Sequence, residues 1–139
     1  MNDVLLLDTH IWVWLINGDA IVKSPQFLKT VDEAIQSSKV RVSIISVWEV
    51  ATLVRKEKIV LPYNCLEWLK KALSESGILV AELTPQIAAE SALLSTDLLK
   101  DPADRIIVTT ARDIGAKLVT KDKEILAYAK TINLPTIAL

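Results

Sequence analysis

The sequence has very little of the residues that form disulfides or bind zinc. It contains one cysteine, Cys65, and one histidine, His10, in 139 residues. A single cysteine cannot form a disulfide within the chain, and structural zinc sites are built from about four cysteine or histidine ligands. We therefore exclude an internal disulfide and a zinc site. Cys65 lies in a helical pattern beside Leu66 and Leu69, and we expect it to be a small core residue.

The sequence also lacks a strong net charge and a long hydrophobic run. The formal net charge is −1 and the isoelectric point is about 5.8. The field of the whole molecule would not attract RNA or DNA as that of a basic protein would, so any nucleic-acid contact must be local or metal-mediated. Asp8, His10 and Asn17 interrupt the first apolar stretch before it reaches the length of a membrane span, and no basic segment precedes it. We expect a cytoplasmic protein that does not enter membranes.

Short apolar runs alternate along the chain with longer helical patterns. The length and the uniform composition fit one domain, residues 1–139, with no linker. Such alternation is typical of an α/β fold, in which helices cover both faces of a parallel sheet. We predict strands at 4–7, 40–45, 78–83, 117–120 and 136–139, and helices at 9–16, 25–38, 46–58, 62–76, from 85 onward, 102–115 and 123–130.

Four carboxylates, Asp8, Glu49, Asp104 and Asp122, lie where strand-like runs give way to helix-like ones. Because the carboxyl ends of parallel strands lie along one edge of the sheet, these residues are expected to converge there. Carboxylates brought within several ångströms repel one another and raise some of their pKa values unless a cation neutralises them. Oxygen ligands suit Mg²⁺ or Mn²⁺. The pattern therefore predicts an acidic metal site.

Each acid also has a purely structural explanation. Ser46-x-x-Glu49 has the spacing of a helix capping box, Asp104 would favour the dipole of a first helical turn, and Asp122 could be a plain N-cap. Asp8 is harder to explain in this way, because it ends a run of buried aliphatic residues where a carboxylate is poorly solvated. Capping does not require four acids to meet at one edge, so we favour the functional interpretation.

The chemistry that such a site supports is phosphodiester hydrolysis. A carboxylate-held metal pair stabilises the attacking and leaving oxygens and can lower the pKa of the attacking water. We assign Asp8 and Asp104 as the main ligands of a first ion. We expect Asp122 and Glu49 to be further ligands, ligands through water, or the group that orients the nucleophile.

Several neighbours of the four acids could support them. Thr9 and Thr120 could hydrogen-bond the adjacent carboxylates and orient them. Asp101 is expected to be a simple N-cap near the site, and His10 a packing or supporting group. Arg105 is expected to pair with an acid or cap a helix rather than bind RNA.

The sequence indicates phosphate-binding residues and interfaces less clearly than it indicates the acidic site. The best phosphate-binding candidates are basic side chains near the predicted site, with a solvated helix end as the alternative: Arg55, Lys56, Lys58, Lys121 and Lys123. Trp12 and Trp14 are two positions apart on one helix and cannot share a face, so at least one of them could lie in an interface.

Four segments carry a resemblance to a known family: LLLDTHIW at 5–12, ISVWEVA at 45–51, DPADRII at 101–107 and LVTKD at 118–122. In this order and spacing they resemble a PIN domain, most closely the VapC-type toxins of bacterial and archaeal toxin–antitoxin pairs. The resemblance spans nearly the whole chain. It implies a five-stranded parallel sheet in a three-layer α/β/α sandwich and a Mg²⁺- or Mn²⁺-dependent endoribonuclease. It also implies a cognate antitoxin that blocks the site, and a homodimer.

Three other functions remain open from the residues. The first is a non-catalytic interaction module that keeps the fold and binds a partner through its apolar helices. The second is a phosphatase or phospho-receiver, although Asp8 is not part of an Asp-x-Asp pair. The third is a DNA-directed nuclease, because acids of this kind act at phosphates and do not read the 2′-hydroxyl of RNA.

Overall fold

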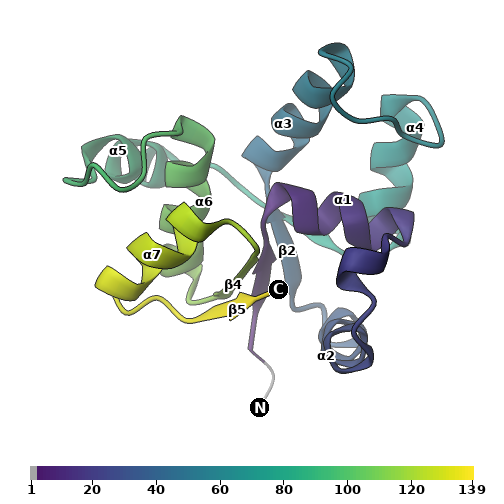
Figure 1. Ribbon diagram of the computed structural model, residues 1–139, viewed down its shortest axis with the longest axis horizontal. Coiled ribbons are helices and arrows are strands. Elements are labelled where there is room, and N and C mark those ends of the chain that lie inside the picture. The colour runs from purple at the N-terminus through teal and green to yellow at the C-terminus, as the bar shows by residue number, and fades with distance from the viewer. Residues whose placement is uncertain (1–2) are drawn as a thin grey trace.

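The computed structural model describes residues 3–139 as a parallel sheet of five strands in the order β3-β2-β1-β4-β5 (Figure 1). The strands are β1 Leu5–Leu7, β2 Val40–Ser43, β3 Leu79–Ala81, β4 Lys117–Thr120 and β5 Thr136–Ala138. The chain runs outward from β1 to β3 on one side and continues through β4 to β5 on the other, so the strand order reverses at β1. Ligands of open α/β sheets bind at such a switch point, beyond the carboxyl ends of the strands.

Helices cover both faces of this sheet, which confirms the predicted three-layer α/β/α sandwich. The helices are α1 Thr9–Asn17, α2 Pro25–Gln36, α3 Ile44–Arg55, α4 Cys65–Lys70, α5 Pro85–Leu93, α6 Pro102–Ile114 and α7 Lys123–Thr131. A 3₁₀ turn at Ala20–Val22 follows α1, and a π-helical turn at Lys71–Glu75 continues α4. Figure 1 shows α6 and α7 on one side of the sheet and α1, α2 and α4 on the other. Within residues 3–139, none of the helices is long and apolar enough to cross a membrane.

Alternate side chains of the central strand enter two separate cores. Leu5 and Leu7 pack with Trp12 and Trp68 in the core beneath α1, α2 and α4. Leu6 points the other way, into the core that α6 and α7 cover. This two-residue alternation is the geometry of a strand, and burial on both faces explains why β1 is wholly aliphatic.

The element boundaries differ from the prediction mainly at α3 and α4. The predicted strand 40–45 ends at Ser43, whose hydroxyl caps the next helix by accepting from the backbone N–H of Ile45 at 3.1 Å. The helix therefore begins at Ile44 and not at Ser46. The predicted helix 62–76 begins only at Cys65, because Asn64 caps it by accepting from the backbone N–H of Glu67. Cys65 itself is half-buried against the first core.

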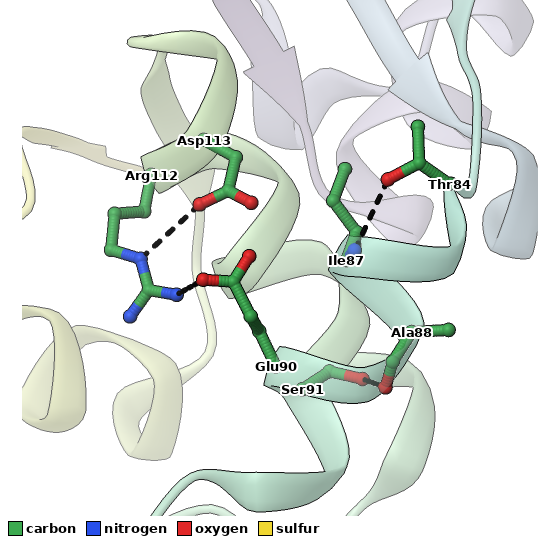
Figure 2. Close-up of polar contacts among 7 residues, drawn as sticks. All are labelled: Thr84, Ile87, Ala88, Glu90, Ser91, Arg112 and Asp113. Carbon is green, nitrogen blue, oxygen red and sulfur yellow. Dashed lines mark hydrogen bonds and ion pairs between the residues drawn. The ribbon is translucent and has the colours of Figure 1, made fainter.

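Polar contacts hold α5 against α6 (Figure 2). The guanidinium of Arg112 pairs with Glu90 at 3.3 Å and with Asp113 at 3.4 Å. The start of α5 is closed by the hydroxyl of Thr84, which accepts from the backbone N–H of Ile87 at 3.1 Å. Of these contacts, the Arg112–Glu90 pair joins α5 to α6, the helix that carries Asp104 at its other end, whereas the other two lie within one helix.

Arg105 fixes the connection between the same two helices. Its guanidinium donates to the backbone carbonyls of Ser91 at 2.9 Å, Leu94 at 2.5 Å and Leu99 at 2.6 Å. It thus caps the end of α5 and ties down the loop that leads to α6. A helix cap was one of the two roles expected for it.

Candidate metal centre

Asp8 lies at the carboxyl end of the central strand and is held by two hydrogen bonds. Its Oδ1 accepts from the backbone N–H of Thr9 at 2.8 Å, and its Oδ2 accepts from the hydroxyl of Thr120 at 2.7 Å. The residue is 8% exposed. Burial raises its pKa, and the two hydrogen bonds act against that rise by stabilising the carboxylate. The Thr120 bond that we predicted is therefore present, and both oxygens of Asp8 are oriented.

Asp122 follows β4, the strand beside β1, and is the N-cap of α7, as its structural explanation predicted. Its Oδ1 accepts from the backbone N–H groups of Glu124 at 2.8 Å and Ile125 at 3.1 Å. Its own backbone N–H donates to the hydroxyl of Thr120 at 3.0 Å. Because both cap bonds use Oδ1, capping leaves Oδ2 available for another partner.

Glu49 is not part of a capping box, because α3 starts two residues earlier than predicted. Its Oε1 accepts a 2.5 Å hydrogen bond from the hydroxyl of Thr9. Ser46 is buried within the helix and lies 2.8 Å from that same hydroxyl. The proton of Thr9 is donated to Glu49, so Ser46 donates to Thr9. Burial is the main cause of a raised pKa at Glu49, and the charge of Asp8 adds to it.

Asp104 does not lie at the end of a strand, where the sequence had predicted it. It lies in the first turn of α6, which follows α5 and a loop, and so it does not stand at the end of a strand. Its backbone N–H donates to Oδ1 of Asp101, the N-cap of α6, at 3.1 Å. The packing of α6 against α3 and the sheet, and not the strand-end rule, brings Asp104 to the other acids.

The pKa of Asp104 is the clearest sign that the acids converge. Burial raises it to about 8, together with the negative charges of Asp101, Asp8, Asp122 and Glu49, in that order of size. In the described chain, no lysine or arginine forms an ion pair with Asp8, Glu49, Asp104 or Asp122. His10 lowers the pKa of Asp8 and of Glu49, but this effect is smaller than the rise that burial causes.

The donors of this cluster fit a hard divalent cation. They are carboxylate oxygens, and His10 is the one nitrogen donor beside them; it lines a hollow of about 350 Å³ with Asp8, Trp14 and Asp122. Among residues 3–139, no three histidine, cysteine, aspartate or glutamate side chains stand at the spacing of a ready-made metal cage. Mg²⁺ commonly uses one or two carboxylates and completes its shell with water, so an open acidic cluster suits it better than it suits zinc.

The basic candidates separate into two groups. Lys121 lines the same hollow as Asp8 and Asp122, so it lies at the site. Arg55, Lys56 and Lys58 are exposed at the far end of α3. Arg55 is six residues beyond Glu49, about 9 Å along the helix axis. Of these candidates, the structure thus places Lys121 beside the acids.

Two residues of the site were not predicted. The spacing of Ser46 to Glu49 fitted a helix cap, but the hydroxyl of Ser46 supports Thr9. The same three-residue spacing also places Ser46 on the helix face of Glu49, which could have indicated this role. Trp48 was not singled out by the sequence analysis, yet it is 62% exposed beside Glu49. Sequence periodicity could not separate it from Trp12 and Trp68, which are both buried.

A family model and a curated relative both match most of this chain. The family model of the PIN domain matches residues 5–131. Over 126 residues the chain is 34% identical to Ribonuclease VapC22 of Mycobacterium tuberculosis, covering 89% of this chain and 91% of that protein.

Solved structures share the fold at lower sequence identity. VapBC2 from Rickettsia felis, bound to a DNA fragment from its promoter, matches with a TM-score of 0.70 and 18% identity over 97% of this chain and 98% of that one. PAE2754 from Pyrobaculum aerophilum matches with a TM-score of 0.62 and 21% identity over 91% and 85%. A toxin–antitoxin complex from Klebsiella pneumoniae matches with a TM-score of 0.57 and 20% identity over 88% and 90%.

Proposed function

Because this chain belongs to the PIN domain family, we propose that it is a metal-dependent endoribonuclease and the toxin of a toxin–antitoxin pair. The ribonuclease activity is supported by the 34% identical relative, whose name is Ribonuclease VapC22. The toxin role is supported by the same relative and by the fold shared with VapBC2 and with a toxin–antitoxin complex. RNA in the cytoplasm would be the substrate, and a cognate antitoxin the partner that blocks the site.

The observation that carries this proposal is the convergence of Asp8, Glu49, Asp104 and Asp122, none of which forms an ion pair with a lysine or arginine among the described residues. The mutual repulsion of these carboxylates, which helps to raise the pKa of Asp104 to about 8, favours a cation at the site. Asp8 and Asp104 would hold the first ion, and Asp122 and Glu49 would contribute further oxygens. When bound, Mg²⁺ or Mn²⁺ supplies charge stabilisation for the phosphate oxygens and activates a water for in-line attack.

The residues around the acids fix how they present their oxygens. The hydroxyl of Thr120 holds Oδ2 of Asp8, and the hydroxyl of Thr9 holds Oε1 of Glu49, which leaves Oε2 of Glu49 for a water or a ligand. Burial raises the pKa of Glu49, which makes this carboxylate a stronger hydrogen-bond acceptor than an exposed glutamate. We assign it the orientation of the attacking water. We also propose a homodimer as the assembled form.

Purified, antitoxin-free protein incubated with total cellular RNA and with matched single-stranded DNA tests the proposal. The reactions contain Mg²⁺, Mn²⁺ or a chelator, and they are run beside Asp8→Asn, Asp104→Asn and a control, Asp32→Asn, which changes an exposed acid of α2. Discrete metal-dependent RNA fragments that both site variants lose and the control keeps would support the nuclease. End-mapping of those fragments would identify the target.

The other outcomes each point to a different conclusion. Cleavage that persists in Asp8→Asn and Asp104→Asn would come from a contaminant and refute the site. Equal cleavage of DNA would assign a less selective nuclease. Protein that binds metal but cleaves nothing under any condition would favour a non-catalytic interaction module.

A further inference from the structure

Trp48 presents a large aromatic face to solvent directly beside the acidic cluster. It is 62% exposed and precedes Glu49 on α3. Trp12 and Trp68 are buried in the first core, where their rings pack edge to face at 5.0 Å. Tryptophan has a large apolar side chain, and exposing it to water costs free energy. An exposed indole beside a candidate site therefore indicates a contact surface.

Trp48 forms one wall of a hollow of about 380 Å³ between α3 and the start of α6. Ile45 and Glu49 line it from the same helix. Ile45 lies three residues before Trp48 and four before Glu49, so it shares a helix face with each of them. Asp101, Pro102, Ala103 and Ile106 line it from the N-cap and first turns of α6. The lining is therefore mostly apolar with two acids, and one of these, Glu49, also belongs to the acidic cluster.

Pro102 and Ile106 also line a second hollow of about 430 Å³. Its two cationic side chains are Lys100 and Arg105. Arg105 is already committed to three backbone carbonyls, whereas Lys100 is exposed. An RNA strand bound at both hollows would contact Trp48 and Glu49 in the first and Lys100 in the second.

We propose that the hollow beside Trp48 is a nucleobase subsite, in which the indole stacks an unpaired base of the RNA and Lys100 contacts a phosphate of the same strand. The inference rests on the proposed nuclease function and names Trp48 as a positioning residue. Unpaired bases stack on exposed aromatic side chains, and their edges carry N–H donors that suit the carboxylate of Asp101. Glu49 and Asp101 repel phosphate, so the hollow beside Trp48 favours the base, and phosphate contact falls to Lys100.

Binding of an unpaired RNA of about ten nucleotides, and of an abasic strand with the same backbone, tests the subsite. Ca²⁺ replaces Mg²⁺ in this assay to neutralise the carboxylates, and anisotropy of a labelled strand reports the affinity. Trp48→Ala should weaken binding of the RNA by about 5- to 100-fold, the range expected for one stacked base, while Trp48→Phe stays within about threefold of wild type. The abasic strand should bind wild type and Trp48→Ala alike.

Two further variants separate the subsite from general surface effects. Tyr63→Ala removes another exposed aromatic residue, outside the hollow, and should leave RNA affinity unchanged. Lys100→Ala should weaken RNA and the abasic strand equally and reduce the slope of log affinity against log salt by about one. In Mg²⁺, Trp48→Ala should raise KM with little change in kcat, and its melting temperature should stay within about 3 °C of wild type because the residue is exposed.

The outcomes separate this subsite from the nuclease proposal. If the wild-type protein cleaves RNA and Trp48→Ala binds RNA with unchanged affinity, the subsite is refuted and the nuclease proposal is not affected. Equal weakening of the RNA and the abasic strand by Trp48→Ala would also refute base stacking. A fall of Trp48→Ala to half the wild-type mass in sedimentation would assign the hollow to a second copy of the chain and overturn the proposal. A wild-type protein that neither binds nor cleaves RNA would remove both.

Discussion

The hydroxyl of Thr120 donates a 2.7 Å hydrogen bond to Oδ2 of Asp8, although the two residues are 112 positions apart. Thr120 ends β4 and Asp8 follows β1, and these strands are neighbours in the sheet, with Leu7 paired to Val119. The same hydroxyl accepts from the backbone N–H of Asp122 at 3.0 Å. One threonine therefore sets the orientation of one acid and the backbone position of another.

Thr120→Val tests this relationship, because valine keeps the shape and removes the hydroxyl. We expect RNA cleavage to fall by about 10- to 100-fold, the usual effect of losing a residue that orients a metal ligand. Stability should fall by about 1–3 kcal/mol, because a buried carboxylate oxygen and a backbone N–H lose their partner. Initial cleavage rates and urea unfolding measure the two effects.

Thr109→Val is the matched control for this substitution. The hydroxyl of Thr109 is also buried, but it has no hydrogen-bond partner among the described residues. Its replacement should leave cleavage unchanged and stability equal or higher, because it removes a buried polar group that makes no bond. Similar losses in both variants would show that threonine volume, and not the Thr120 hydrogen bond, is what matters.

The raised pKa of Asp104 predicts that the metal-free protein loses stability as the pH rises. The pKa is about 8 in the folded chain against 3.8 for an ordinary aspartate, so the folded state binds this proton more tightly than the unfolded state. The stabilisation is complete below about pH 4 and is lost progressively as the pH rises to about 8. Urea midpoints in chelator should therefore be lower at pH 8 than at pH 5.5.

Asp104→Asn should make that pH dependence shallower, because asparagine carries no titrating proton. Some slope should remain, since burial also raises the pKa of Asp8 and Glu49, which act in the same direction. Mg²⁺ should reverse the trend in wild type, because the metal and the proton compete for the same carboxylates. An identical slope in wild type and Asp104→Asn would contradict the assignment of this pKa to Asp104.

Arg105→Lys should destabilise the protein by about 1–3 kcal/mol, because a lysine cannot reproduce a planar fork that donates to several carbonyls. Arg112→Lys is the control: its side chain is 40% exposed and makes surface ion pairs, so the change should be below about 1 kcal/mol. Urea unfolding compares the two. An Arg105→Lys protein of wild-type stability but weaker RNA binding would instead indicate a direct contact with the substrate.

Gly77→Ala should destabilise the chain more than Gly115→Ala. Both glycines have positive φ, +81° and +68°, so an alanine at either position costs about 1–2 kcal/mol. At Gly77 a Cβ would also stand 2.9 Å from Cγ2 of Ile35, whereas nothing lies within 4 Å at Gly115. We expect an additional loss of about 1 kcal/mol or more at Gly77 from this contact. Thermal or urea unfolding of both variants decides, and equal losses would mean that Ile35 moves aside freely.

Local patterns in the sequence were sufficient for the fold class and for two of the acids. The aliphatic runs predicted the strands because a strand buried on both faces must be apolar throughout. Asp8 and Asp122 follow directly from such runs, so the strand-end rule placed them correctly. The starts of α2, α5 and α6 were predictable because a capping serine, threonine or aspartate followed by proline is a purely local signal.

Only the tertiary structure decided how Glu49, Asp104 and Trp48 relate to the site. Glu49 matched a capping box in the sequence, but the earlier start of α3 turned it toward Thr9, since a cap is fixed by where the strand ends and not by spacing alone. Asp104 depends on the packing of α6, and Trp48 is exposed because of the side of α3 it occupies beside α6. The sequence thus determined which residues are candidates for the chemistry, through local propensity and burial, whereas long-range packing determined which of them meet.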